Sequence, residues 1–198
     1  LHDALPILVP KGDNDQIKVL FMTASPKNLS TLDVNKESNN VKTESFGKDL
    51  FIDIYPHVDK DGMIDAVSHL QPQIIHYSGH GRTGGLETID HATGNAATLK
   101  TAYLSEMFAL FAEIGVKCVV LNSCWSASQA KAISEQGIPV VGMLRPIKDE
   151  VAIKFSKDFY RLLVSNNPLE RIFKLVRLKM EDDSKAIPSL WFNGKRIA

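Results

Sequence analysis

The chain has 198 residues, 44% hydrophobic and 23% charged, with 23 basic and 23 acidic residues. This length suits one compact domain with a single filled core. The balanced charge, without a Lys/Arg stripe, argues against direct binding of nucleic acid. No apolar run approaches the roughly 20 residues that span a bilayer, so no membrane partner is expected.

Residues 1–16 are interpreted as a flexible or non-native lead-in. LHDALPI, residues 1–7, resembles a translated sequencing adapter, and PKGDND has the composition of a flexible segment. We therefore assign the domain to residues 17–198. We also expect further sequence, and further domains, to precede Leu1.

The first half of the chain alternates strand-like and helix-like segments. IKVLFMTA, residues 17–24, is a continuous apolar run typical of a strand buried on both faces of a parallel sheet. The segment QIIHYS, residues 73–78, runs directly into Gly79-His80-Gly81. We predict strands over residues 17–24, 50–55 and 73–78, and helices over residues 29–44 and 60–70.

The second half continues the alternation. GGLETID and NAATL predict a small β-hairpin. Asp149 is expected to cap a helix, and Pro168 to start the last one. The closing segment IPSLWFNG is interpreted as an edge strand. We predict further helices over residues 104–114 and 126–136, and strands over residues 116–121 and 138–144.

Strands that alternate with helices predict an α/β fold, with a mostly parallel sheet and helices on both of its faces. In such sheets, ligands bind at the carboxyl ends of the strands. That rule selects two places in this chain, the end of QIIHYS and the end of VKCVVL. His80 follows the first and Cys124 follows the second.

The chemistry of these two residues favours acyl transfer. A cysteine between a strand and a helix lies where the helix N-terminus favours its thiolate. Glycines on both sides of His80 allow a sharp turn and the close approach of a substrate backbone. A cysteine beside a histidine is the minimal pair of nucleophile and base.

IIHYSGHG followed by VVLNSCWSA resembles the caspase-like cysteine peptidases, and most closely the bacterial CHAT domains. Caspases place the histidine about 50 residues before the cysteine, and here His80 precedes Cys124 by 44 residues. KVLFMTASP and IPVVGMLRPIKDEVAIKFSKDFYRLL extend the resemblance over residues 17–180. It implies a caspase-like three-layer sandwich.

The resemblance also implies the roles of the site residues. Cys124 would be the attacking thiolate and His80 the general acid/base. The backbone N–H groups of Gly81 and Cys124 would bind the developing oxyanion. Asn122 would line the pocket for the side chain before the cut bond, where relatives that prefer basic residues often have Asp. A neutral amide cannot by itself select a charged side chain.

Other interpretations of these residues have weaker support in the sequence. His76 and His80 have the four-residue spacing of a metal pair, but that spacing serves a helix and His76 lies on a predicted strand. No metal and no cofactor are therefore expected, and His76 is assigned a structural role beneath the site. GHGRTGG lacks the ending and the following helix of a phosphate-binding loop. Cys118, in the middle of a strand, is assigned to packing.

The leading hypothesis is a cytoplasmic cysteine endopeptidase that cleaves a peptide or protein substrate. The alternative is a catalytically inactive CHAT-like module for interaction or regulation, and a thiol-dependent transpeptidase is a third option. The resemblance implies control by a regulatory domain, partner protein or ligand, and a role in bacterial defence or cell death. We expect the segment from Arg82 to Lys100 to be mobile and to shape the substrate groove.

Overall fold

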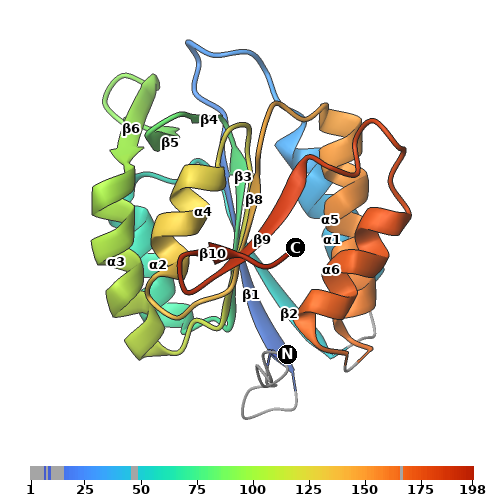
Figure 1. The fold of residues 1–198 in the computed structure, drawn as a ribbon. Coiled ribbons are helices and arrows are strands. Elements are labelled where there is room, and N and C mark those ends of the chain that lie inside the picture. The colour runs from blue at the N-terminus through green and yellow to red at the C-terminus, as the bar shows by residue number, and fades with distance from the viewer. Residues whose placement is uncertain (1–6, 8, 10–15, 46–48, 166) are drawn as a thin grey trace.

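A mostly parallel seven-stranded sheet with the order β10-β9-β8-β7-β3-β1-β2 divides the molecule (Figure 1). The structure is a computed structural model that describes residues 7, 9, 16–45, 49–165 and 167–198. The parallel strands are β1 (Ile17–Ala24), β2 (Leu50–Tyr55), β3 (Ile74–Gly79), β7 (Cys118–Asn122) and β8 (Val140–Met143). The strands β9 (Pro188–Phe192) and β10 (Lys195–Arg196) extend the sheet in antiparallel pairing.

Three helices cover each face of the sheet within the described part of the chain (Figure 1). One face carries α2 (Lys60–Leu70), α3 (Thr101–Ile114) and α4 (Ala127–Ser134). The other carries α1 (Val34–Ser45), α5 (Asp149–Leu163) and α6 (Leu169–Leu178). A separate three-stranded antiparallel sheet contains β4 (Gly81–Arg82), β5 (Gly85–Ile89) and β6 (Ala96–Lys100).

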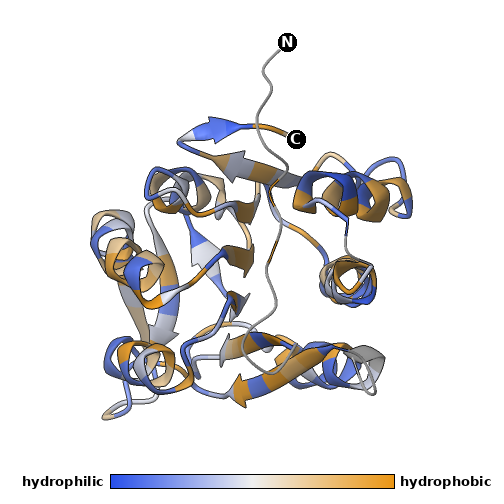
Figure 2. Ribbon diagram, turned by 90° about the horizontal axis from the view of Figure 1, so that it is seen from below, coloured by the Kyte–Doolittle hydropathy of each residue, from blue (hydrophilic) through white to orange (hydrophobic). Residues whose placement is uncertain are grey.

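The period of two along each strand divides the core into two clusters. On β1, Leu20 and Met22 join the cluster beneath α2, α3 and α4, whereas Val19 and Phe21 join the cluster beneath α1, α5 and α6. Figure 2 shows the hydrophobic residues gathered where helices and strands face one another. Both faces of the central strands are therefore buried, as their continuous apolar runs predict.

The three-layer α/β sandwich predicted from the sequence is confirmed, and so is the hairpin of β5 and β6. The predicted 29–44 helix begins later, at Val34, because Asp33 precedes it and accepts the Lys36 N–H at its Oδ1 (3.2 Å). The prediction that Asp149 caps α5 is wrong. Lys148 occupies the cap position without a side-chain hydrogen bond, and Asp149 is the first helical residue.

Two residues of the predicted lead-in contact the domain. Ile7 and Val9 pack against the cluster beneath α5 and α6, and the Ile7 carbonyl accepts the Leu169 N–H at 2.8 Å. Apart from these two and Gln16, the segment 1–16 lies outside the described residues, so the boundary at residue 17 stays a prediction. Within the described chain, no helix is both long and apolar enough to cross a bilayer.

Gly142 on β8 allows α4 to pack closely against the sheet. A methyl group added there would lie 2.6 Å from Ala130 Cβ and 3.0 Å from the Ser126 carbonyl oxygen. We predict that Gly142→Ala lowers the free energy of unfolding by about 1–3 kcal/mol, measured by urea denaturation.

The added methyl should conflict less with a smaller neighbour. A double-mutant cycle with Ala130→Gly should therefore show a favourable coupling energy between the two changes. Strict additivity would mean that this contact does not limit the packing of α4.

Candidate active site

The backbone of His80 is fixed by β3 and β5. The Tyr77 hydroxyl donates to the His80 carbonyl at 3.1 Å and to the Glu87 carbonyl at 2.5 Å, and the Glu87 N–H donates to the His80 carbonyl at 3.0 Å. Burial, and then the charge of Glu87, raise the pKa of Tyr77 well above its ordinary value. The Tyr77 hydroxyl therefore keeps its proton and anchors the turn at the end of β3.

The imidazole of His80 has one defined partner. Its Nε2 lies 2.8 Å from the Ser30 carbonyl oxygen, in the loop between β1 and α1. A carbonyl oxygen only accepts, so Nε2 carries a proton in this contact. In the neutral ring, Nδ1 is then the nitrogen left to accept a proton.

Cys124 lies in a tight turn between β7 and α4. Trp125 has a left-handed backbone with φ of 57°, an uncommon conformation for a bulky residue, and its side chain is exposed. The Ser126 hydroxyl donates to the Leu121 carbonyl at 3.0 Å and accepts the Met143 N–H at 2.9 Å. The predicted helix of residues 126–136 begins at Ala127, so Cys124 precedes it by a turn instead of opening it directly.

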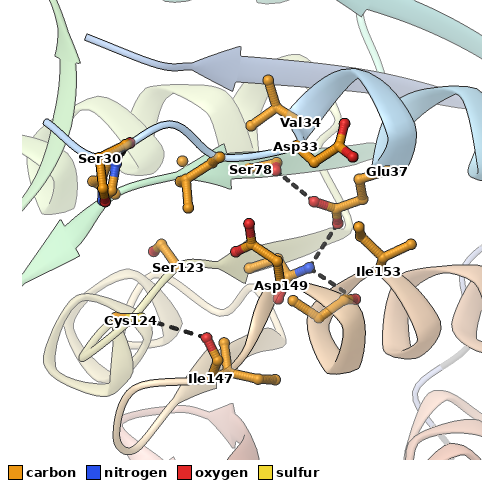
Figure 3. Close-up of a pocket in the computed structure, with 15 residues that line it drawn as sticks. Ser30, Asp33, Val34, Glu37, Ser78, Ser123, Cys124, Ile147, Asp149 and Ile153 are labelled. Atoms are coloured by element: carbon orange, nitrogen blue, oxygen red, sulfur yellow. Dashed lines mark hydrogen bonds between the residues drawn. The ribbon is translucent and has the colours of Figure 1, made fainter. Parts of the chain in front are cut away.

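The two motifs meet at one pocket. A Cβ added to Gly81 would clash with the Cys124 carbonyl oxygen and lie 2.9 Å from Ser123 Oγ, so the His80-Gly81 turn packs directly on the cysteine turn. His80 and Cys124 both line a pocket of about 190 Å³ at the carboxyl ends of β3 and β7 (Figure 3). Cys124 Sγ also lies 4.0 Å from the Ile147 carbonyl oxygen, in the loop before α5.

In the described part of the chain, two backbone N–H groups beside this pocket have no acceptor. Because the Glu87 N–H donates to the His80 carbonyl, Gly81 and Leu86 form a non-hydrogen-bonded pair of the β4–β5 ladder. The Gly81 N–H is therefore left out of that ladder. Within the described residues, the Cys124 N–H also has no acceptor. Both groups expected to bind an oxyanion are thus available.

Asn122 lies at the base of the pocket in a buried polar network. Its Nδ2 donates to Glu37 Oε1 at 2.6 Å, and lies 3.0 Å from Ser156 Oγ and 3.1 Å from the Ala152 carbonyl oxygen. These three acceptors fix the orientation of the amide. Asn122 Oδ1 is then buried without a hydrogen-bond partner among the described residues.

Glu37, on α1, is the centre of this network and was not identified from the sequence. Its carboxylate also accepts from Ser78 and Ser156 hydroxyls, each at 2.5 Å, and its Oε1 lies 3.1 Å from His76 Nε2. The period of two on β3 and β7 places His76, Ser78 and Asn122 on the face that α1 covers. The one signal in the sequence that could have identified Glu37 is the alternation of polar residues on β3 and β7. Such residues on a covered face call for a polar partner, here an acid, on the helix opposite.

The electrostatics of Glu37 follow from these contacts. Burial opposes its ionisation, but the hydrogen bond and charge of His76, with the hydroxyls of Ser156 and Ser78, lower the pKa of Glu37 below its ordinary value of 4.5. The carboxylate is therefore ionised at neutral pH.

The remaining candidates fall outside the pocket lining. His76 is fully buried, and its two ring nitrogens contact Tyr160 and Glu37, which suits the structural role assigned to it. Burial raises the pKa of Cys118 to about 12, in keeping with packing. No residue from Arg82 to Lys100 lines this pocket, and the role of that segment in a wider substrate groove stays a prediction. Ser30, Ile147 and Asp149 line the pocket instead.

Comparison with known proteins identifies relatives over most of the chain. The sequence model of the CHAT domain family matches residues 5–193. A Roc-COR-CHAT protease from an unidentified prokaryote is 24% identical over 162 residues, which cover 77% of this chain and 15% of that protein. The chain therefore matches a small part of a much longer relative.

Two solved structures are similar to this chain at low sequence identity. Caspase-1 from Spodoptera frugiperda superposes with a TM-score of 0.59 at 12% identity, covering 97% of this chain and 91% of that one. The complex of Porphyromonas gingivalis RgpB pro- and mature domains gives a TM-score of 0.49 at 10% identity, with 86% of this chain and 45% of that one covered. The caspase likeness supports the same α/β sandwich.

The ionised Glu37 generates a prediction about stability and pH. The pKa of Glu37 is lower in the folded state than in the unfolded state. Its carboxylate therefore stabilises the fold at pH values above the pKa of the unfolded state, and this contribution is lost as the pH falls through the pKa of the folded state. We predict that Glu37→Gln lowers the free energy of unfolding by about 3 kcal/mol near pH 7. The difference from wild type should shrink below about pH 4.5.

Urea denaturation of both proteins between pH 3 and pH 8 measures this difference. Glu113→Gln, which makes the same change on the exposed surface of α3, should stay within about 0.5 kcal/mol of wild type. A gap between Glu37→Gln and wild type that is constant over this range would show that Glu37 is not ionised.

Proposed function

Since the chain belongs to the CHAT domain family, we propose that it is a cysteine endopeptidase that cleaves a peptide or protein substrate through a thioester on Cys124. The observation that carries this proposal is the shared pocket. His80 and Cys124 come from separate strand ends, and both line it. The parallel pairing of β3 and β7 thus brings an imidazole and a thiol, the pair that acyl transfer needs, to one pocket.

In the proposed reaction, His80 Nδ1 takes the proton of the Cys124 thiol, while the Ser30 carbonyl holds Nε2–H at 2.8 Å. The thiolate attacks the substrate carbonyl carbon and forms a C–S bond. The oxyanion accepts hydrogen bonds from the N–H groups of Gly81 and Cys124. The protonated imidazole then gives its proton to the amine as the C–N bond breaks.

Hydrolysis of the thioester completes the cycle. His80 accepts a proton from water, the hydroxide oxygen attacks the thioester carbonyl, and the C–S bond breaks. The thiolate recovers the proton through the same imidazole. The residues of this chain supply each proton transfer, and no cofactor enters the proposed scheme.

Regulation by a further domain or partner is part of the proposal. It is supported by the curated relative, which is a multidomain protein of which this chain matches 15%.

We also place the protein in the cytoplasm, because Cys118 and Cys124 are both free thiols and such thiols persist in reducing compartments. The alternative of an inactive regulatory module would require Cys124 to be dispensable.

Reaction with peptidyl acyloxymethyl ketones tests the catalytic pair. We predict a single covalent adduct on Cys124, detected by intact-protein and peptide mass spectrometry, and none on the buried Cys118. Cys124→Ala should abolish the adduct with little change in fold. His80→Ala should slow its formation by about 100-fold or more.

His69→Ala, on the exposed surface of α2, is the matched control and should react at the wild-type rate. The assignment is wrong if the adduct forms on Cys118. It is equally wrong if His80→Ala reacts as fast as His69→Ala, because the imidazole would then not assist the thiol.

A further inference from the structure

Asp149 is a carboxylate of the pocket that makes no hydrogen bond or ion pair among the described residues. It is the first residue of α5, and Figure 3 shows its carboxylate directed into the space between Ser123 and Ser78. Asp33, another acidic residue of the pocket, caps α1 through the Lys36 N–H. Asp149 caps nothing, and its carboxylate has no partner among the described residues.

Asn122 supplies a second, independent acceptor. Its side chain is 5% exposed, and its Oδ1 has no donor within the described structure. The amide cannot turn over to find one, because Nδ2 is held by the Glu37 carboxylate at 2.6 Å. A buried carbonyl oxygen without a donor is unfavourable, because it has lost its hydrogen bonds to water. A bound side chain with an N–H group would remove this cost.

The rest of the pocket is apolar on its walls and acidic in charge. Leu32, Val34, Ile147 and Ile153 contribute aliphatic surface. The ionisable side chains of the lining, apart from His80 and Cys124, are Asp33, Glu37 and Asp149, and no Lys or Arg is among the lining residues described. Lysine and arginine combine an aliphatic stem with a cationic head that donates hydrogen bonds. The pocket offers a surface for each part.

We propose that this pocket binds the side chain of a lysine or arginine that immediately precedes the cut bond, with Asp149 as the residue that selects its charge. This inference rests on the proposed peptidase function. The Asp149 carboxylate pairs with the ammonium or guanidinium group, and Asn122 Oδ1 accepts one of its N–H donors. The Glu37 carboxylate, whose oxygens already accept four contacts, positions Asn122.

Cleavage of matched peptides tests the inference. The peptides differ only in the residue before the cut: lysine, arginine, norleucine, glutamine or glutamate. Norleucine has the stem of lysine without its charge. We predict that kcat/KM for lysine or arginine exceeds that for norleucine by about tenfold or more, the size of one charge-assisted hydrogen bond. The ratio should fall as salt is added.

The decisive variant is Asp149→Asn, which keeps the shape of the side chain. It should reduce the preference for lysine over norleucine by about tenfold. Glu150→Gln removes the same charge from the next residue, which does not line the pocket, and should leave the preference unchanged. An equal preference in wild type and Asp149→Asn overturns the inference, as does a preference for glutamate.

Binding to the inert Cys124→Ala variant separates this inference from the peptidase proposal. Fluorescence anisotropy with the lysine and norleucine peptides should show tighter binding of lysine, lost in Cys124→Ala/Asp149→Asn. If that result holds while wild type cleaves nothing, the pocket assignment stands and the peptidase proposal fails. If wild type cleaves without preferring lysine or arginine, the reverse is true. Equal or undetectable binding of both peptides overturns the pocket assignment.

Discussion

The parallel pairing of β3 with β7 is the constraint on which the site depends. Its register sets Ser78 beside Asn122, so the residues that follow each strand emerge at the same edge of the sheet. His80 lies two residues beyond Ser78, and Cys124 two residues beyond Asn122. A shift of one residue in this register would turn the alternate side chains to the other face. It would separate the two motifs and also expose buried apolar side chains, so packing of the core and assembly of the site impose the same register.

The same alternation explains how a charge is tolerated inside the molecule. On the face beneath α1 and α5, β3 and β7 carry polar residues towards their carboxyl ends and apolar residues at their beginnings. Glu37 enters from α1 and gathers their donors around one carboxylate. An isolated buried carboxylate would be strongly unfavourable, and the hydrogen bonds offset this cost. The network thereby joins α1, α5 and two strands directly beneath the pocket, and it leaves Asn122 with one unoccupied acceptor.

The sequence predicted most of the fold because its signals are local. A continuous apolar run identified β1 with its bounds, and helical spacing identified α2 with its bounds. The contributions to the pocket that were not predicted come from loops and long-range contacts. Ser30 acts through its carbonyl oxygen, which no residue type reveals. Glu37 meets partners 39 to 119 positions away. Asp149 has the sequence position of a capping residue, and only its orientation in space shows that the carboxylate faces the pocket instead.

The central claim is that the imidazole of His80 and the sulfur of Cys124 act on one bound peptide. Its most direct test is a crystal structure of the protein after reaction with a peptidyl ketone that carries lysine next to the reactive carbon. The account predicts a bond to Cys124 Sγ, the ketone oxygen within hydrogen-bond distance of the Gly81 and Cys124 N–H groups, His80 beside the sulfur, and the lysine side chain reaching Asp149. An adduct on Cys124 with the peptide directed away from the pocket, or with His80 turned out of reach of the reacting atoms, would contradict it.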